Sequence, residues 1–330
     1  TQNWLSNNKN KIAQLIVQAR EVNKFHGTFL SSIMKYQVNG RIHGEIQQLR
    51  SDSGGTVSGR LSMSNPNLQQ VPARNKDFGP KIRSLFIPEE GYKWGSFDYS
   101  QQEPRMTVHY AASIGDGYEG SNELVEAYHN TEADFHQTVA DLVGIERSQA
   151  KTIGLGLMYG MGKNKLALSL GVSKDEADQL IVKYNNKVPF VKKLSDRCKF
   201  AADEKGVIRT KKGRKCRFDM WETKDFGLHV AEKFDDAVAK YGKDNIKRAY
   251  TYKALNRLIQ GSSADQTKQA MLDCYNQGHL PMLQIHDELC FNIKDDNHAN
   301  EIKKIMENAI EFKVPSVVDK GIGESWGDAK

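Results

Sequence analysis

Two acidic positions far apart in the sequence each follow a short apolar run. Asp98 comes directly after residues 93–97, and Asp287 comes soon after residues 282–285, with Glu288 beside it. If both runs are buried strands, carboxylates at their ends would converge at the rim of a sheet and repel one another unless a divalent cation lay between them. Acidic residues also end strands because they suit turns. The positions alone therefore leave a metal site and two plain turns open, and a turn is the commoner case.

A second set of residues lies on a predicted helix. Arg147, Lys151, Leu155 and Tyr159 are spaced four apart, so at 3.6 residues per turn they form one slowly turning stripe. Two cations can grip phosphates, while an apolar residue and a ring lie against a base and a sugar. The alternative is a solvated basic face that runs into a core leucine and tyrosine, which is common.

Two glycines inside this helix favour a function for the stripe. Gly154 and Gly156 cost about 1 kcal/mol each in a helix interior, so we expect a close approach or a hinge that needs them. His136 lies on the preceding helical segment and could reach the same phosphates. A single histidine is more often structural, so this role depends on other support.

Composition excludes several classes of protein. The chain has 330 residues, about two domains' worth, with 38% hydrophobic and 27% charged residues. Lys and Arg (47) exceed Asp and Glu (41), an excess that suits a polyanionic partner without requiring one. The four cysteines form no C-x-x-C pair, which argues against zinc and redox motifs. With no basic segment followed by an apolar run at the N-terminus and no 18-residue apolar run, we expect a cytoplasmic protein that spans no membrane.

The order of the predicted elements indicates an α+β fold. Helices are predicted over 8–34, over most of 104–272 and over 298–312; strands over 82–88, 93–97, 282–285 and 289–293; a loop over 51–75; a hairpin near 206–218; and a short tail at the end. A strand pair, a long helical insertion and a second strand pair predict a sheet domain with a helical domain inserted in it.

Several segments closely resemble the motifs of family A DNA polymerases, the family of bacterial DNA polymerase I. Residues 98–105 (DYSQQEPR) resemble the family's first motif, residues 147–160 its nucleotide-binding helix, and residues 285–288 its final H-D-E motif. Smaller signatures occur in the same order at 59–72, at Asn256 with Gln260-Gly261, and at 321–326. The resemblance extends from about residue 8 to residue 327, and it depends on this many motifs in one order, since any single one is weak.

The resemblance implies a right-hand polymerase fold, with an antiparallel-sheet palm, inserted helical fingers and a partial helical thumb. We expect the C-terminal part of the thumb at 1–40, the palm at 41–110 and 269–330, and the fingers at 111–268. The family has more thumb, and often an exonuclease domain, upstream. Because no exonuclease D-x-E motif precedes the palm and no initiator Met begins the sequence, we expect a partial chain that does not proofread by itself. A processivity factor and an upstream exonuclease domain are the partners this leaves open.

The resemblance also implies a DNA-directed DNA polymerase, a nucleotidyltransferase that joins a dNTP to the primer 3′-hydroxyl of primer–template DNA. Asp98 and Asp287, with the carbonyl of Tyr99, would hold two Mg²⁺ ions. Lys151 would protonate the leaving pyrophosphate. Glu288 is expected behind the metal ligands or at the primer end.

Substrate contacts follow from the same motifs. The expected dNTP-binding residues are Arg147, Lys151, His136, Glu103, Leu155, Tyr159 and Gln101. Among them, Glu103 would block a ribose 2′-hydroxyl and Tyr159 would pack near the templating base. The expected DNA-binding residues are Arg60, Asn256, Gln260 and His286, in the minor groove, where contacts check the shape of a pair rather than its sequence.

The sequence departs from the family pattern at a few positions. Gln102 and Pro104 replace apolar residues of the first motif, and Tyr252 stands where many relatives have Arg. Leu155 replaces the Phe or Tyr that stacks beside the incoming sugar, and in the family Tyr there tolerates dideoxynucleotides whereas Phe rejects them. These compact, divergent motifs indicate a bacteriophage replication enzyme.

Two other functions remain as alternatives. A single-subunit RNA polymerase shares the palm carboxylates and the Arg/Lys helix, but Glu103 and the His-Asp-Glu triplet argue against it. A non-catalytic DNA-binding fragment would explain a partial thumb, although the carboxylates and phosphate ligands are all retained.

Overall fold

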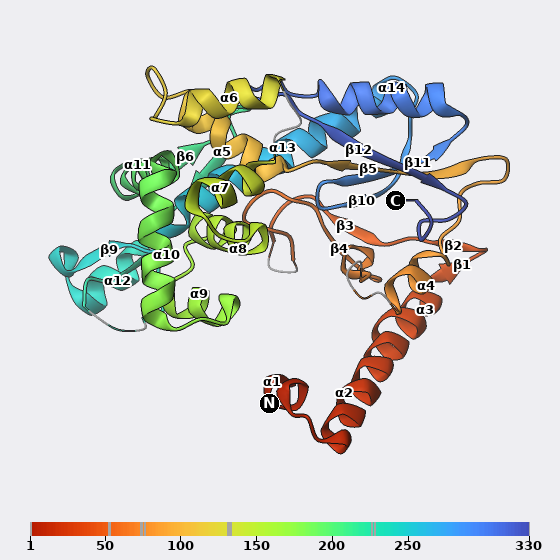
Figure 1. Cartoon of the computed structure of the whole chain (residues 1–330), viewed down its shortest axis with the longest axis horizontal. Helices are drawn as coiled ribbons and strands as arrows, with labels where there is room; N and C mark the ends of the chain where they lie inside the picture. Colours follow the sequence, from red (N-terminus) through yellow and green to blue (C-terminus); the bar gives the residue numbers. More distant parts are fainter. Residues whose placement is uncertain are drawn as a thin grey trace.

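The structure is a computed structural model of the chain, and it describes residues 2–51, 54–72, 75, 77–130, 134–225, 227 and 229–329. Figure 1 shows a sheet with flanking helices, a helical region formed by the middle of the chain, and a helical arm at the N-terminus. Within the described residues, no helix is both long and apolar enough to cross a membrane. The four cysteines are buried and unpaired.

The bounds of the elements are as follows. The α-helices are α1 (Gln2–Asn7), α2 (Lys11–Lys24), α3 (Ser32–Lys35), α4 (Gly79–Arg83), α5 (Gln102–Ala112), α6 (Ser121–Asn130), α7 (Phe135–Val143), α8 (Arg147–Met158), α9 (Lys163–Leu170), α10 (Lys174–Lys187), α11 (Pro189–Lys205), α12 (Phe234–Tyr241), α13 (Ala254–Asn276) and α14 (Asp296–Glu307). The strands are β1 (Gln37–Val38), β2 (Arg41–Ile42), β3 (Glu45–Gln47), β4 (Ser62–Ser64), β5 (Lys93–Tyr99), β6 (Val207–Arg209), β7 (Lys215–Arg217), β8 (Trp221–Thr223), β9 (Ile246–Arg248), β10 (Pro281–Ile285), β11 (Glu288–Ile293) and β12 (Val318–Gly323).

The central sheet is antiparallel, with the strand order β10-β11-β5-β12. The strands predicted over 93–97, 282–285 and 289–293 are confirmed as β5, β10 and β11. β12 lies in the segment predicted as a tail, and that prediction was wrong. Its pairing partner is β5, far away in sequence, so no local pattern reveals it.

Both faces of the sheet are covered, because successive side chains of a strand point to opposite faces. Phe97 and Tyr99 pack in one core cluster with residues of α13 and α14. Trp94 belongs to a second cluster, on the other face, together with Trp326. Asp98 lies between Phe97 and Tyr99 in the strand, so its carboxylate is on the same face as Trp94.

The middle of the chain is mainly helical, as predicted for 104–272. Helices α5 to α11 and α13 pack around one apolar core in which Phe135, Tyr184, Phe190 and Leu255 are almost fully buried. The hairpin predicted near 206–218 is confirmed as β6 and β7. The antiparallel pair of β8 and β9 was not predicted, because these strands have three residues each and are far apart in sequence.

The N-terminal arm is helical over nearly all of the predicted range 8–34. After α2 the chain continues through a π-helical stretch, Phe25–Ser31, directly into α3. The apolar positions of α2 face solvent: Ile12 is 68% exposed and Leu15 is 53% exposed. The periodicity therefore predicted the helix correctly but not a buried face.

Other local predictions need correction. The strand predicted over 82–88 is wrong: α4 ends at Arg83, a turn follows, and Leu85 and Ile87 are exposed rather than part of a sheet. Pro80 favours this helix because proline is preorganised for the first helical turn. The helix predicted over 298–312 is α14, which begins two residues earlier and ends at Glu307. The predicted loop 51–75 contains strand β4, and its residues 52, 53, 73 and 74 lie outside the described residues.

Candidate active site

The structure brings the predicted acidic residues together at one end of the central sheet. Asp98 on β5 is directly opposite Glu288, the first residue of β11. Asp287 lies in the turn between β10 and β11, and its carbonyl oxygen accepts a hydrogen bond from the backbone N–H of Tyr99 at 3.4 Å. The pairing of β5 with β11 thus places the two motifs side by side.

Sequence reasoning missed a further carboxylate. Asp319 on β12 is the partner of Asp98 on the side of β5 away from Glu288. Cross-strand partners share a face of the sheet, so Asp98 has an acidic neighbour on each side. The only signal for Asp319 was its place two residues before the Gly321 motif, and its role depends on the unpredicted pairing of β12.

This arrangement concentrates negative charge. Asp98 is exposed at the rim of the sheet, but partial desolvation, and then the negative charges of Asp287, Glu288 and Asp319, raises its pKa to about 7. Burial also raises the pKa of Asp287, while the positive charge of Arg60 opposes the rise. Carboxylates this close cannot all ionise easily unless a cation lies among them.

The side chain of Glu288 already has partners in the protein. Its Oε1 accepts hydrogen bonds from the Ser96 hydroxyl and from Trp326 Nε1, the latter at 3.2 Å, and the Cys290 thiol is 3.5 Å away. These donors hold the carboxylate toward the sheet. Glu288 therefore adds charge beside Asp98 while its own Oε1 is occupied.

The oxygen donors near Asp98 fit a hard divalent cation. Asp98 and Asp287 supply carboxylates, and the Tyr99 side chain points to the other face, where its hydroxyl donates to Met306 O at 2.6 Å, so only the Tyr99 carbonyl is available to a metal. In the described part of the chain, no three His, Cys, Asp or Glu side chains are grouped as a metal site. Mg²⁺ typically takes only one or two protein carboxylates and fills its other positions with water and phosphate oxygens. The donor set is compatible with that pattern.

The predicted basic stripe lies on α8. Glu146 and Gln149 form a capping box that fixes the start of this helix. Lys151 is exposed, and no acidic side chain of the described residues lies within ion-pair distance of it. Arg147 is different: its Nε donates to Asp134 Oδ2 at 2.7 Å. One stripe cation is therefore paired and the other is open.

The glycines of α8 permit close packing, as predicted. A Cβ at Gly154 would be 3.1 Å from the Tyr184 hydroxyl, and one at Gly156 would be 3.4 Å from Leu166 and Met161 side-chain atoms. The contact at Gly154 is tight, and the one at Gly156 is at the limit of ordinary van der Waals contact. The glycines allow α8 to lie close to its neighbouring helices, which holds the stripe in place.

His136 lies near the two cations of the stripe. Burial, opposed by the charge of Asp134 and aided by the charges of Lys151 and Arg147, lowers the pKa of His136 to about 4. Its Nδ1 is buried and has no hydrogen-bond partner among the described residues. Gln101 supports the same helix, because its Oε1 accepts the Phe135 backbone N–H at 2.9 Å.

A polar cluster joins the stripe to the sheet. Arg60 Nη2 donates to Glu103 Oε1 at 2.8 Å, and the Tyr159 hydroxyl donates to Glu103 Oε2. Gln260 on α13 lies close to the Tyr159 hydroxyl, and burial, followed by the charge of Glu103, raises the Tyr159 pKa. Four predicted residues from different parts of the sequence therefore meet in one place.

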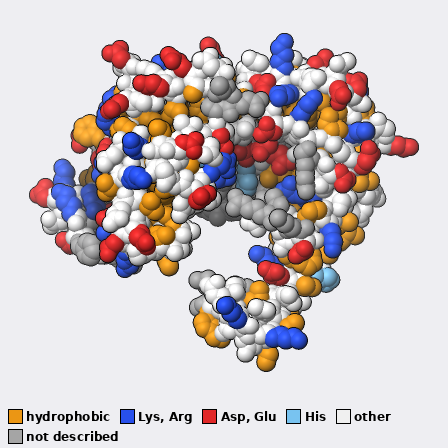
Figure 2. Space-filling view, in the orientation of Figure 1, with side chains coloured by type: hydrophobic (Ala, Val, Ile, Leu, Met, Phe, Trp, Pro, Cys, Tyr) orange, Lys and Arg blue, Asp and Glu red, His pale blue; other side chains and the backbone are white. Residues whose placement is uncertain are grey.

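The remaining predicted residues surround this cluster. Asn256 is half-buried, one turn before Gln260 on α13. His286 is exposed in the turn before Asp287, with φ at 54°. Leu155 is half-buried and packs against the helical core. Figure 2 shows acidic side chains beside basic ones and a histidine in the hollowed middle of this face.

The chain is similar in sequence to known DNA polymerases. The sequence model described as DNA polymerase family A matches residues 2–328. A protein of Pseudomonas phage M6 named DNA-directed DNA polymerase is 40% identical over 96% of this chain and 51% of its own length. DNA polymerase I of Pseudomonas aeruginosa is 30% identical over 97% of this chain and 34% of its own length.

A solved structure has the same fold. The polymerase domain of Pol1 from M. smegmatis, in complex with DNA primer-template and dNTP, superimposes with a TM-score of 0.78 and 27% identity, covering 99% of this chain and 55% of that one. The chain spans about half the length of the phage relative, and a third of the length of the bacterial one. The mixed helix-and-sheet polymerase fold predicted from the motifs is confirmed, and the chain belongs to DNA polymerase family A.

Proposed function

We propose that this chain contains the polymerising centre of a template-directed DNA polymerase, which joins a dNTP to a primer 3′-hydroxyl. The observation that carries the proposal is the meeting of Asp98 and Asp287 with the cluster of Arg60, Glu103 and Tyr159. The arrangement would combine acidic metal ligands with Glu103, which can exclude a 2′-hydroxyl, and with Arg60, which can contact the primer end. This is the set that nucleotidyl transfer requires.

Asp98, Asp287 and the carbonyl of Tyr99 would hold two Mg²⁺ ions. When bound, these ions activate the 3′-hydroxyl and neutralise the leaving pyrophosphate in an in-line displacement. The protein's own contribution is to bring the carboxylates together, and the raised pKa of Asp98 means that binding of a cation would displace its proton near pH 7. Asp319 and Glu288 increase the negative charge that attracts a cation.

The triphosphate would lie along α8. Lys151 is open to it and would protonate the pyrophosphate, whereas Arg147 would share its guanidinium between the phosphates and Asp134. Neutral His136 would donate a hydrogen bond rather than supply a full charge. Leu155 would lie beside the sugar, and Gln101 would hold the start of α7 in place.

Glu103 would block a ribose 2′-hydroxyl, and Tyr159 would hold Glu103 in that position. Arg60, Asn256, Gln260 and His286 would contact the primer and template in the minor groove. In this scheme residues 1–40 are the end of the thumb, 41–110 and 269–330 are the palm, and 111–268 are the fingers. The M. smegmatis relative binds primer-template DNA and dNTP, which supports the same ligands here.

The wider setting follows from the relatives. A phage relative and bacterial DNA polymerase I support a role in DNA synthesis in the cytoplasm of a bacterial or phage-infected cell. A processivity factor or an exonuclease domain remains a candidate partner. Among the residues that the structure describes, no feature of the site favours an RNA polymerase or a non-catalytic fragment over this function.

Single-nucleotide insertion tests the proposal. A primer–template with a defined templating base is mixed with the chain, Mg²⁺ and one dNTP or rNTP at a time. We expect insertion of the complementary dNTP only. Random addition, preference for the complementary rNTP, or no insertion would each contradict the proposal.

A further inference from the structure

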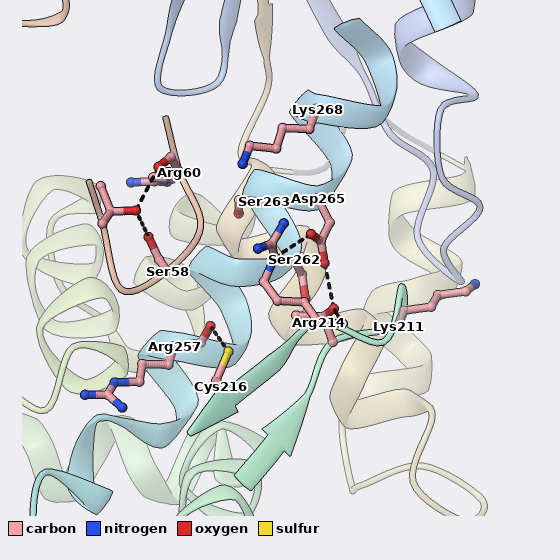
Figure 3. A network of polar contacts seen from close by, with 12 residues as sticks. Ser58, Arg60, Lys211, Arg214, Cys216, Arg257, Ser262, Ser263, Asp265 and Lys268 are labelled. Atoms are coloured by element: carbon pink, nitrogen blue, oxygen red, sulfur yellow. Dashed lines mark hydrogen bonds and ion pairs between the residues drawn. The ribbon is translucent and has the colours of Figure 1, made fainter. Parts of the chain in front are cut away.

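The β6–β7 hairpin contains an arginine that none of the assigned roles uses. Arg214 Nε donates to Asp265 Oδ1 at 2.6 Å, and Asp265 on α13 is only 8% exposed. The Thr210 hydroxyl donates to Asp265 Oδ2 at 2.6 Å and accepts the Arg214 backbone N–H at 3.1 Å. Both oxygens of Asp265 are therefore used to hold Arg214 and its hairpin, as Figure 3 shows.

The hairpin is fixed at further points. The Lys211 backbone N–H donates to the Tyr110 hydroxyl of α5 at 2.9 Å. On strand β7, Arg217 O accepts a hydrogen bond from Arg257 Nη1 of α13 at 2.7 Å. With its turn and its second strand both attached, the hairpin is a rigid support for the Arg214 side chain.

Arg214 lies against the backbone of the turn that carries Arg60. Gly59 has φ at +83°, and a Cβ placed there would be 2.6 Å from Arg214 Cζ. Gly261 on α13 lies beside the same group, since a Cβ there would be 3.2 Å from Thr210 Cγ2 and in ordinary contact with Ser58 O at 3.5 Å and Arg214 Cδ at 3.6 Å. The turn, the hairpin and α13 therefore meet at two glycines, with the guanidinium between them.

This turn determines where Arg60 lies. The Thr56 hydroxyl closes it by donating to Arg60 O at 2.8 Å. Arg60, the residue after Gly59, then reaches Glu103 at 2.8 Å. A shift of the backbone at Gly59 would move the Arg60 guanidinium, and a 1 Å misplacement can cost about a hundredfold in rate.

We infer that Arg214, held by Asp265, is a positioning residue that presses on the Gly59 turn and so places Arg60 against Glu103 and the primer end. The inference rests on the proposed function for its effect on DNA synthesis. The competing explanation is an ion pair that only stabilises the fold. Buried pairs are weak evidence for stability, and this pair contacts a turn that carries a site residue.

Two substitutions test the contact from its two sides. Arg214→Lys keeps the positive charge beside Asp265 but removes the flat guanidinium. Gly59→Ala inserts a methyl group against that guanidinium. If one variant fails to fold, the other still tests the contact. We expect each to slow dNTP insertion roughly tenfold. The thermal midpoint of Arg214→Lys should stay near that of the wild type, whereas that of Gly59→Ala should fall, because an alanine is strained at a φ of +83°. Lys212→Met removes an exposed charge from the same hairpin and is the matched control, with the wild-type rate expected.

The double variant with Arg60→Ala separates positioning from stability. If Arg214 acts through Arg60, adding Arg214→Lys to Arg60→Ala slows insertion no further, because coupled residues are not additive. The inference would be overturned if the two single effects on the insertion rate multiply in the double variant. It would also be overturned if Arg214→Lys alone inserts at the wild-type rate.

The hydrogen-exchange rates of the backbone amides of residues 56–61 report the local stability of the turn and do not depend on catalysis. Faster exchange in Arg214→Lys than in the wild type supports the inference, and unchanged exchange overturns it. This measurement is valid even if the chain inserts no nucleotide. A failure to insert would count against the proposed function alone.

Discussion

The Tyr159 hydroxyl at the end of α8 donates a hydrogen bond to the carboxylate of Glu103 on α5. The same carboxylate accepts from Arg60 at 2.8 Å and is largely buried. A side chain with both oxygens bonded has little freedom to move aside for an additional atom on the substrate. This pairing holds rigidly the carboxylate that is expected to exclude a ribose 2′-hydroxyl. It also links the position of that carboxylate to the position of α8.

Glu103→Ala should admit ribonucleotides, because it opens the space that the carboxylate fills. We expect the preference for dNTP over rNTP to fall roughly tenfold or more. Tyr159→Phe should lower it less, since Arg60 still holds Glu103. Single-nucleotide insertion with paired dNTP and rNTP measures this, with Glu123→Ala on α6 as the control. An unchanged preference in Glu103→Ala would place the test of the sugar elsewhere.

The acidic pair and the basic stripe could be predicted because each depends on local order in the sequence. An apolar run before Asp98 and another before Asp287 predict two strand ends, and a spacing of four predicts one face of α8. The prediction that these segments meet in one site came only from the family resemblance. Nothing in the sequence near Asp98 states which strand will lie beside β5.

The features that were missed depend on contacts between distant segments. Asp319 becomes a neighbour of Asp98 only when β12 pairs with β5. Arg147 was expected to be free for phosphates, but Asp134, which caps α7, also reaches it. The Arg214–Asp265 pair likewise depends on the packing of a hairpin against α13.

Leu155→Tyr should admit dideoxynucleotides and Leu155→Phe should not, because only Tyr offers a hydroxyl in place of the missing 3′-hydroxyl. Both should speed dNTP insertion up to roughly tenfold, since an aromatic contact contributes about 0.5–1.5 kcal/mol beyond burial. Insertion rates for dNTP and ddNTP measure this. Leu157→Tyr, about 200° around the helix, is the control. If Leu155→Tyr discriminates as the wild type does, Leu155 does not face the sugar.

His109 should make the protein less stable in mild acid. Burial, and then the charges of Lys211 and Lys313, lowers the pKa of His109 to about 4, whereas a histidine in an unfolded chain has a pKa of about 6.5. Between these values the unfolded chain binds more protons than the folded one. The free energy of unfolding therefore falls as the pH falls from 6.5 toward 4, and this contribution is constant above that window.

His109→Asn keeps an acceptor for the Lys313 backbone N–H, which His109 Nδ1 accepts at 3.1 Å, and removes the titration. The loss of unfolding free energy between pH 7.5 and pH 5.5 should be smaller in this variant by about 1 kcal/mol. Urea unfolding at the two pH values measures it, with the exposed His26→Asn as the control. An equal loss in wild type and His109→Asn would contradict the account of this residue.

The most direct test of the central claim is the rate of dNTP insertion by Asp98→Asn and Asp287→Asn in a single turnover with Mg²⁺. Each change keeps the shape of the side chain and removes the charge that would bind a metal. We predict that the rate falls roughly a thousandfold or more, that the affinity for primer–template DNA stays close to that of the wild type, and that exposed Asp296→Asn inserts normally. Insertion by either site variant within tenfold of the wild-type rate would contradict the account.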